Sequence, residues 1–209
     1  MSATIPATLV RELREKTGVG FMECKTALAE VGGDMERAIT RLREKGLASA
    51  SKKMGRMASE GLVVSYIHGG GKIGVLLELN CETDFVAKTD EFALLAKDVA
   101  MQVAATNPSY IGRDEVPQAV LENERAIFRA QVATSGKPEA VIDRIVQGRL
   151  EKFFREVCLL EQAFIRDPEV TIEDRIKGVI AKVGENVVIR RFCRYHQGEG
   201  MERRPTSSG

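Results

Sequence analysis

The spacing of the apolar residues changes twice along this 209-residue chain. It is three or four residues before residue 45, two residues between 62 and 81, and three or four again after residue 89. A period near 3.6 indicates amphipathic helices, and a period of two indicates strands with one buried face. The order of these segments predicts an α+β fold, in which a small antiparallel sheet packs on helices.

Residues 1–46 are predicted to form three short helices. The first is expected to end at Thr17-Gly18, because glycine readily adopts the left-handed conformation of a helix C-cap. The third should begin at Asp34, a favourable N-cap, and end at Gly46. The apolar positions expected to form the core of these helices are Ile5, Leu9, Leu13, Phe21, Cys24, Leu28, Val31, Met35, Ala38, Ile39 and Leu42.

The rest of the chain is predicted to comprise a linker at 47–60, an α+β core at 61–197 and a tail at 198–209. The small, basic linker is expected to be partly helical, and a surface helix is the alternative. The predicted core elements are strands at 62–67, 73–81 and 187–195 and helices at 90–107, 117–134, 138–163 and 171–184. The tail has little to bury and is expected to be disordered.

The balance of charge does not indicate a nucleic-acid partner. Formal net charge is +1, from 31 basic and 30 acidic side chains, and the sequence contains no basic stripe. Nucleic-acid binders usually carry a strong basic excess. The chain also lacks Trp and has only 5% aromatic residues, so a base-stacking surface is not expected either.

The cysteines and the N-terminus indicate a cytoplasmic protein. Cys24, Cys81, Cys158 and Cys193 show no C-x-x-C spacing, so we expect separate reduced thiols and no zinc site. Residues 1–4 lack the features of a signal peptide. No apolar run approaches the length of a membrane span, so no membrane association is expected.

Catalytic motifs can be tested and mostly discarded. Gly69, Gly71 and Gly74 satisfy G-x-G-x-x-G, but a predicted strand follows them, which indicates a hairpin turn and not a dinucleotide site. The segment starting at His68 mimics a lipase oxyanion-hole motif, yet no G-x-S-x-G nucleophile segment accompanies it. There is no Walker A segment. We expect no catalytic residues, metal or cofactor, and an enzyme is the weaker class.

Thr83-Asp84-Phe85-Val86 lies between a predicted strand and a predicted helix, and two interpretations are open. In the local interpretation, Asp84 caps backbone amides and Phe85 fills the core, as most aromatic residues near strand ends do. In the functional interpretation, Phe85 is a rigid apolar anchor on a loop, a kind of group that dominates interfaces.

Two long motifs resemble those of the elongation factor Ts family. They are LVRELREKTGVGFMECKTAL at residues 9–28 and NCETDFVAK at residues 80–88. Shorter matches are SYIHG at 65–69, SGKP at 135–138 and KVGEN at 182–186. The resemblance runs from about residue 4 to about residue 200, with the motifs in the family's order.

The resemblance implies a guanine-nucleotide exchange factor of translation that binds elongation factor Tu and promotes GDP release. It implies an N-terminal domain similar to ubiquitin-associated domains, followed by an α+β core, with both in contact with the partner. The loop Thr83-Asp84-Phe85-Val86 would act beside the nucleotide. In the family, its aspartate and phenylalanine are implicated in disturbing magnesium coordination.

Other partner contacts are implied with less detail. The N-terminal contact surface would lie between Arg11 and Lys25, and His68 would touch the partner away from the nucleotide. By thermodynamic linkage, such a factor needs binding energy from several contacts and one rigid side chain inserted near the metal, but no catalytic group of its own.

The chain resembles the short form of the family, with one core half and no coiled-coil insertion. This form dimerises to complete its partner surface, and symmetric pairing is the commonest oligomer solution. In the short form Cys193 would lie at the dimer contact, where a disulfide and a free cytosolic thiol are both open. An adaptor built on the N-terminal helices and an enzyme with an unusual site remain as alternative functions.

Overall fold

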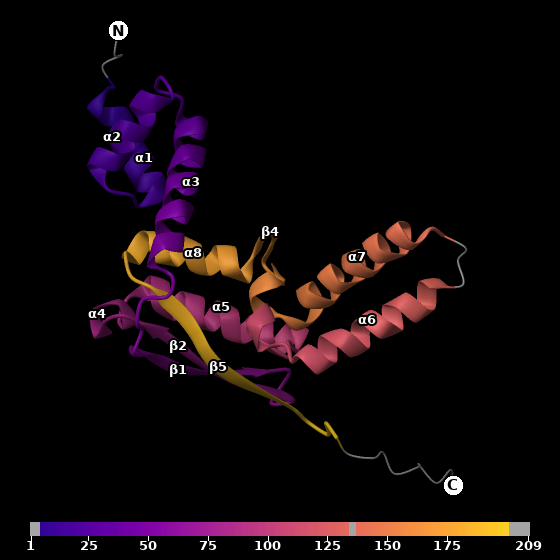
Figure 1. Cartoon of the computed structure of the whole chain (residues 1–209). Coiled ribbons are helices and arrows are strands. Elements are labelled where there is room, and N and C mark those ends of the chain that lie inside the picture. Colours follow the sequence, from indigo (N-terminus) through magenta and orange to yellow (C-terminus); the bar gives the residue numbers. More distant parts are fainter. Residues whose placement is uncertain (1–4, 134–136, 201–209) are drawn as a thin grey trace. The chain divides into compact units, whose positions relative to one another are not determined.

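The computed structural model describes residues 5–133 and 137–200 and confirms the predicted α+β class, helices with a small antiparallel sheet (Figure 1). In chain order the elements are α1 Ala7–Thr17, α2 Phe21–Glu30, α3 Met35–Lys53, β1 Glu60–His68, β2 Ile73–Cys81, α4 Asp84–Ala87, α5 Asp90–Thr106, α6 Gln118–Ala133, α7 Glu139–Val157, β3 Ala163–Phe164, β4 Asp167–Thr171, α8 Ile172–Val183 and β5 Val187–His196. Short 3-10 turns lie at Arg113–Glu115 and Leu159–Glu161.

The chain divides into two compact units. The first takes in Met1–Gly61, Asn80–Leu95 and Glu173–Val188, and the second takes in Leu62–Leu79, Ala96–Ile172 and Ile189–Gly209. The first unit therefore joins α1–α3 with the end of β2, with α4 and with most of α8. The domain boundaries predicted at residues 46, 60 and 197 stay predictions.

Helices α1, α2 and α3 enclose a core of their own. Gly18 ends α1 with φ 70° and donates its N–H to the Arg14 carbonyl, as predicted for a C-cap. The Asp34 carboxylate accepts a hydrogen bond from the Arg37 N–H at 3.0 Å, which confirms the N-cap of α3. The buried residues of this core are Val10, Leu13, Cys24, Ala27, Leu28, Ala38 and Leu42. Phe21 was predicted to join them and does not: it is the first residue of α2 and is 41% exposed.

The predicted helix end at Gly46 is wrong, because α3 continues to Lys53. Gly46 lies where α3 approaches α8, and a Cβ built there would be only 3.2 Å from Cβ of Ala181. The glycine therefore permits close helix packing instead of capping a helix. Residues 47–53 are helical, so the first half of the predicted linker extends α3.

Strands β1, β2 and β5 form one sheet in the order β1-β2-β5. Gly69, Gly70 and Gly71 connect β1 to β2 with φ of 62°, 65° and 91°, a region that favours glycine. A strand follows this turn, so the G-x-G-x-x-G pattern belongs to a hairpin, as predicted. Alternate residues of β2 are buried, which confirms the period of two: Val75, Leu77, Leu79 and Cys81.

The other face of the sheet, here called the outer face, exposes apolar side chains. In the second unit these are Val63 and Ile67 of β1, Leu76 of β2 and Tyr195 of β5, which are 68%, 65%, 50% and 71% exposed. The ion pair between Arg191 of β5 and Glu78 of β2 lies on the same face, at 2.6 Å. Isolated exposed apolar residues are ordinary, but four on one small sheet form a candidate contact surface.

Helices α6 and α7 lie where helices were predicted at 117–134 and 138–163, and they pair as a hairpin (Figure 1). Their core is small and consists of Val132, Ile142, Val146 and Leu150, with Phe128, Ile145 and Phe154 packed against it. A two-helix contact this short does not need a strict heptad repeat. The expected absence of the coiled-coil insertion of longer family members stays a prediction.

Helix α7 was predicted to run to residue 163 and instead ends at Val157. The carbonyl of Val157 accepts hydrogen bonds from the N–H groups of Ser109 and Tyr110, at 2.9 and 3.0 Å. These bonds to another segment replace the next turn of helix. The chain then makes the antiparallel pair β3–β4, and α8 follows directly.

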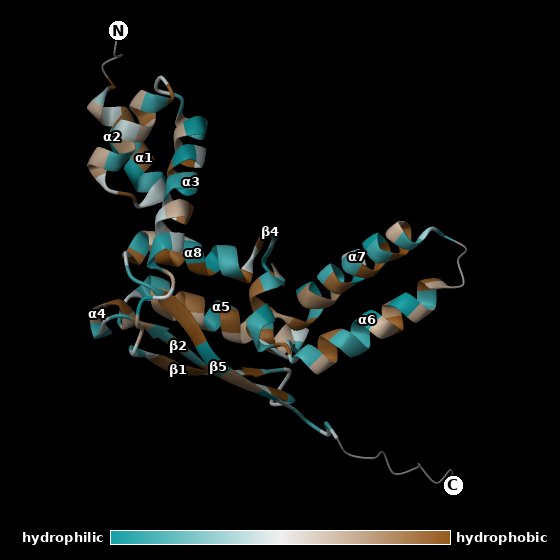
Figure 2. Cartoon of the chain, viewed as in Figure 1, coloured by the Kyte–Doolittle hydropathy of each residue, from teal (hydrophilic) through white to brown (hydrophobic). Residues whose placement is uncertain are grey.

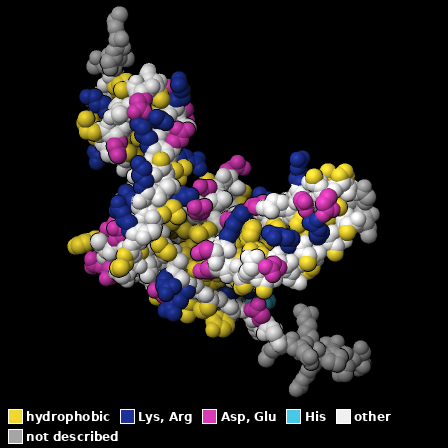
Figure 3. Space-filling model, in the orientation of Figure 1, with side chains coloured by type: hydrophobic (Ala, Val, Ile, Leu, Met, Phe, Trp, Pro, Cys, Tyr) yellow, Lys and Arg dark blue, Asp and Glu magenta, His cyan; other side chains and the backbone are white. Residues whose placement is uncertain are grey.

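The surface carries both signs of charge. Lys and Arg are interspersed with Asp and Glu over the visible face (Figure 3). Apolar residues are frequent along α5 and the strands, whereas apolar and polar residues alternate along α6 and α7 (Figure 2). None of the helices formed by residues 5–133 and 137–200 is long and apolar enough to cross a membrane. Residues 198–200 form turns, and the rest of the predicted tail and the Ser135-Gly136 break lie outside the described residues.

Two leucines of β2 test this burial pattern. Leu79 is fully buried and Leu76 is half exposed on the outer face. Leu79→Ala should lower the free energy of unfolding by about 2–5 kcal/mol, because it leaves a cavity in the core. Leu76→Ala, the matched control, should change it by less than about 1 kcal/mol. Urea denaturation followed by circular dichroism measures both, and equal losses would contradict the assignment of the two faces.

Candidate functional site

The segment after β2 is a one-turn helix that is anchored by its buried residues. Helix α4, Asp84–Ala87, begins directly after Thr83, which has the extended backbone of an N-cap residue, φ −130° and ψ 156°. Val86 and Ala87 are buried, at 7% and 6% exposure. The Thr89 hydroxyl donates to the Val86 carbonyl at 2.8 Å. It also accepts a hydrogen bond from the Phe92 N–H in the first turn of α5. The turn is therefore tied to the helix that follows it.

Thr83 is fixed by hydrogen bonds on all of its polar groups. Its N–H and its hydroxyl donate to the two carboxylate oxygens of Glu185, at 2.9 and 2.7 Å. Its carbonyl accepts from the Cys81 thiol at 3.1 Å and from the Ala87 N–H at 3.3 Å. Hydrogen bonds to a carboxylate are among the stronger ones in proteins. The start of α4 thus has a fixed position within the first unit.

Phe85 and Asp84 face solvent, so both parts of the local interpretation are wrong. Phe85 is 79% exposed and fills no core. The Asp84 carboxylate pairs with Lys88 at 2.6 Å, one helical turn later, and accepts no backbone N–H within the part of the chain that the structure describes. The hydrogen bond from Lys88 and the charge of Asp84 raise the pKa of the Lys88 ammonium. Because both partners are exposed, this pair adds little to stability.

The arrangement presents an aromatic ring on a rigid support. Val86 and Thr83 anchor the turn, and Phe85 projects from between them. A large apolar side chain that is held in place yet left in water loses little conformational entropy when a partner covers it. Such a group can insert into another protein, which is the functional interpretation of this loop.

The other predicted contact residues lie apart from the loop in the chain. Arg11 of α1 and Lys25 of α2 are exposed and belong to the first unit, as the loop does. His68, at the end of β1, is exposed in the second unit and stacks on Tyr66, with ring centroids 5.9 Å apart. Its Nδ1 lies 3.1 Å from the Tyr66 hydroxyl.

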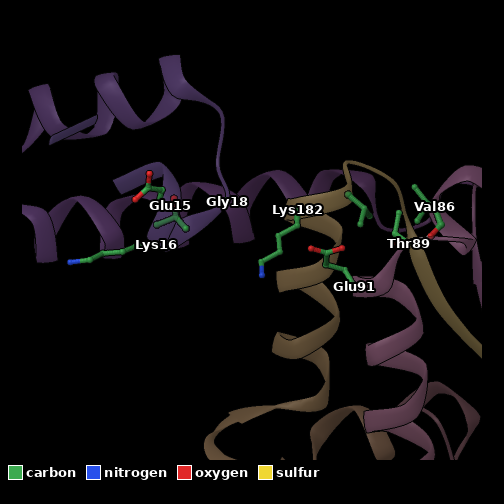
Figure 4. A pocket seen from close by; sticks show the side chains of 9 residues that line it. Glu15, Lys16, Gly18, Val86, Thr89, Glu91 and Lys182 are labelled. Carbon is green, nitrogen blue, oxygen red and sulfur yellow. Dashed lines mark hydrogen bonds between the residues drawn. The ribbon is translucent and has the colours of Figure 1, made fainter. Parts of the chain in front are cut away.

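One open pocket of about 440 Å³ connects the N-terminal helices to the loop region within the first unit. The end of α1, from Glu15 to Gly18, forms one side, and Val86 and Thr89 form part of the other. Lys182 of α8 and Glu91 of α5 also line it (Figure 4). The stretch between the predicted contacts Arg11 and Lys25 therefore borders the same pocket as the loop.

The four cysteines are all free thiols, and three of them are buried. Burial raises the pKa of Cys81, to which the Glu185 carboxylate adds, and burial raises the pKa of Cys158 to about 11. Cys193 of β5 is exposed. Among the described residues no group of three or more His, Cys, Asp or Glu side chains is arranged to hold a metal ion.

The residues that hold the loop were not predicted from the sequence. Glu185 and Asn186 were noted only as part of a family motif, with no role. They contact the segment at 82–83, which lies more than one hundred positions earlier in the chain. A contact over that separation has no local signal, so only the presence of both segments among the family motifs pointed to it.

Comparison with known proteins gives one consistent family. The model of the family described as Elongation factor TS matches residues 18–199. A protein named Elongation factor Ts from Thermoanaerobacter sp. (strain X514) is 63% identical over 198 residues, covering 95% of this chain and 97% of that protein. Its namesake from Caldanaerobacter subterraneus subsp. tengcongensis is 62% identical over 199 residues, covering 95% and 100%. That from Desulforamulus reducens is 60% identical over 202 residues, covering 97% and 93%.

The neighbouring residues Phe85 and Val86 allow a stability test of the loop. Phe85→Ala should change the free energy of unfolding by less than about 0.5 kcal/mol, because the ring is exposed in the folded protein. Val86→Ala should lower it by about 1–3 kcal/mol, since two buried methyl groups are lost. Both follow from urea denaturation, and a large loss in the Phe85 variant would restore the interpretation of this ring as a core residue.

Proposed function

Because this chain belongs to the elongation factor Ts family, we propose that it binds elongation factor Tu with GDP bound and promotes GDP release by disturbing the Mg²⁺ and phosphate site. The family consists of nucleotide-exchange factors of translation elongation, and they are not catalytic enzymes in themselves. The similarity covers nearly the whole of this chain and of these relatives, so the family assignment does not rest on a single shared segment.

The observation that carries the proposal is the exposure of Phe85 on a fixed turn. The ring is 79% exposed, although Thr83 and Val86 on either side are hydrogen-bonded or buried. Of the four predicted loop residues, Asp84 and Phe85 are thus free to meet a partner. Thr83 and Val86 serve to hold them, so the predicted contact set divides into contact residues and supporting residues.

The mechanism follows from thermodynamic linkage. GDP and Mg²⁺ bind a GTPase through phosphate contacts that require one arrangement of the site. If Phe85 inserts where that arrangement must open, the chain binds the nucleotide-free form more tightly than the GDP form. It must then weaken GDP binding by the same factor by which GDP weakens its own binding. Exchange of this kind needs no acid, base or nucleophile in the chain.

Further contacts supply affinity at a distance from the nucleotide. We assign these to Arg11 and Lys25 on the N-terminal helices and to His68 at the end of β1, all of which are exposed. Charged side chains at the edge of an interface mainly affect the association rate and specificity. Their removal should therefore weaken binding without removing the ability to displace GDP. The role of the family in translation supports a cytoplasmic location.

A second copy of this chain is the proposed occupant of the outer face. Tyr195 of that face and the exposed Cys193 both lie on β5, and a two-fold axis would place the patch of one copy against the same patch of the other. Covering these side chains removes apolar area from water, which favours association. The interface would then be apolar in origin, with any Cys193 disulfide as an addition.

Labelled GDP tests the exchange function. Catalytic amounts of the chain should accelerate the release of fluorescent GDP from elongation factor Tu. Phe85→Ala should lower that acceleration by about tenfold or more, which corresponds to one lost aromatic anchor. Ile165→Ala, which shortens an exposed apolar side chain of the second unit, is the matched control and should leave it unchanged. No acceleration by the unaltered chain would remove the exchange function itself.

Sedimentation velocity tests the dimer. The unaltered chain should sediment as a dimer, and Leu76→Asp should shift it to monomer, because a charge would be buried at the centre of the interface. Cys193→Ser should remain dimeric under reducing conditions. Val141→Asp, at an exposed apolar position of α7, is the control. A Leu76→Asp chain that still sediments as a dimer would place the interface elsewhere.

A further inference from the structure

Two carboxylates, one from each segment, connect the end of β2 with the segment after α8 by hydrogen bonds. Glu185 accepts the N–H and hydroxyl hydrogen bonds of Thr83, while Glu82 accepts the N–H of Asn186 at 2.6 Å. Each segment thus supplies one carboxylate and receives the other's. We call these four residues, Glu82, Thr83, Glu185 and Asn186, the carboxylate clamp. All four belong to the first unit.

The clamp is anchored at both ends. Gly184, with φ 82°, ends α8 by donating its N–H to the Ile180 carbonyl, and Glu185 follows at once. The Asn186 side chain is buried and donates to the Arg56 carbonyl at 2.7 Å. The Arg56 guanidinium lies 3.7 Å from the Glu82 carboxylate. The end of α8 and the segment after α3 are thereby joined to the start of α4.

We infer that Glu185 is a positioning residue for exchange, which holds the Phe85 ring in its working place through Thr83. This inference rests on the proposed function, because it assigns a role within that same loop. Glu185 does not touch the partner in this account. It fixes Thr83, the residue directly before α4, and the Phe85 ring projects two positions later.

The effect should fall on turnover more than on binding. Without Glu185, Phe85 remains exposed and able to contact a partner, but the turn that carries it has lost two hydrogen bonds. A Phe85 ring on a mobile turn must be ordered before it can act, and that ordering costs free energy. The cost falls mainly on the step that opens the nucleotide site, because that step depends on the exact position of the ring. The rate of GDP release at saturation should therefore drop, whereas the concentration for half-maximal stimulation should change little.

A fluorescence measurement tests the positioning without the partner. The chain contains no Trp, so Phe85→Trp introduces a single fluorescent probe at the ring position. In that background Glu185→Gln and Thr83→Val should lower the steady-state anisotropy of the probe, because the turn becomes mobile. Thr83→Ser keeps both donors and should leave it unchanged. Glu173→Gln is the matched control, since that carboxylate lies on α8 but pairs with Lys177. Unchanged anisotropy in Glu185→Gln and Thr83→Val would overturn the inference.

The exchange assay then tests the role. Glu185→Gln and Thr83→Val should each lower the maximal rate of GDP release about tenfold. The double variant should be no slower than the slower single variant, because both changes disrupt the same contact, that between Thr83 and Glu185. Thr83→Ser and Glu173→Gln should behave as the unaltered chain. Thermal denaturation of each variant shows that it is folded at the assay temperature, and Thr83→Val, which keeps the side-chain shape, serves if Glu185→Gln is not.

The two proposals fail in different ways. If the unaltered chain does not accelerate GDP release, the exchange function is wrong, and the anisotropy result still decides whether Glu185 fixes the ring. If the unaltered chain is active and Phe85→Ala is slow, but Glu185→Gln keeps the full rate, the positioning role is overturned. Additive losses in the double variant would also overturn it, since Glu185 would then act by a route other than Thr83.

Discussion

The bidentate contact between Glu185 and Thr83 fixes the residue from which the loop at residues 83–86 begins. It joins residues 102 positions apart and ends the strand β2 in one defined place. From that point the geometry follows: a single helical turn, with Val86 directed into the core and Phe85 directed into water. A loop held in this way can present an aromatic ring without burying it, which is unusual for a phenylalanine.

Much of the fold was predictable because it has local causes. The Gly18 and Asp34 caps, the triple-glycine hairpin and the alternation along β2 depend on neighbouring residues, and the structure confirms them. The errors share a different cause. The sequence predicts a helix end at Gly46, because the neighbour that requires a glycine there, Ala181, is far away in sequence. The prediction for helix α7 runs too far because the carbonyl of Val157, its last residue, is bonded by Ser109 and Tyr110, which are also distant in sequence.

The candidate site shows the same division. The loop at residues 83–86 was found from the sequence, yet its chemistry alone favoured a buried Phe85, and only the family resemblance favoured a contact role. The structure removes the local interpretation, since the ring is exposed and Asp84 pairs with Lys88. The supporting residues Glu185 and Asn186 carry no sequence signal of their own. The loop is therefore recognisable from a sequence motif, whereas the residues that support it are recognisable only from tertiary contacts.

The central claim is that this chain prefers elongation factor Tu without nucleotide and that Phe85 creates the preference. Isothermal titration against the nucleotide-free and the GDP·Mg²⁺ forms of that GTPase measures it directly. Binding to the nucleotide-free form should be at least about tenfold tighter, a coupling typical of linked sites, and the difference should be smaller for Phe85→Ala. Equal affinity of the unaltered chain for the two forms would contradict it.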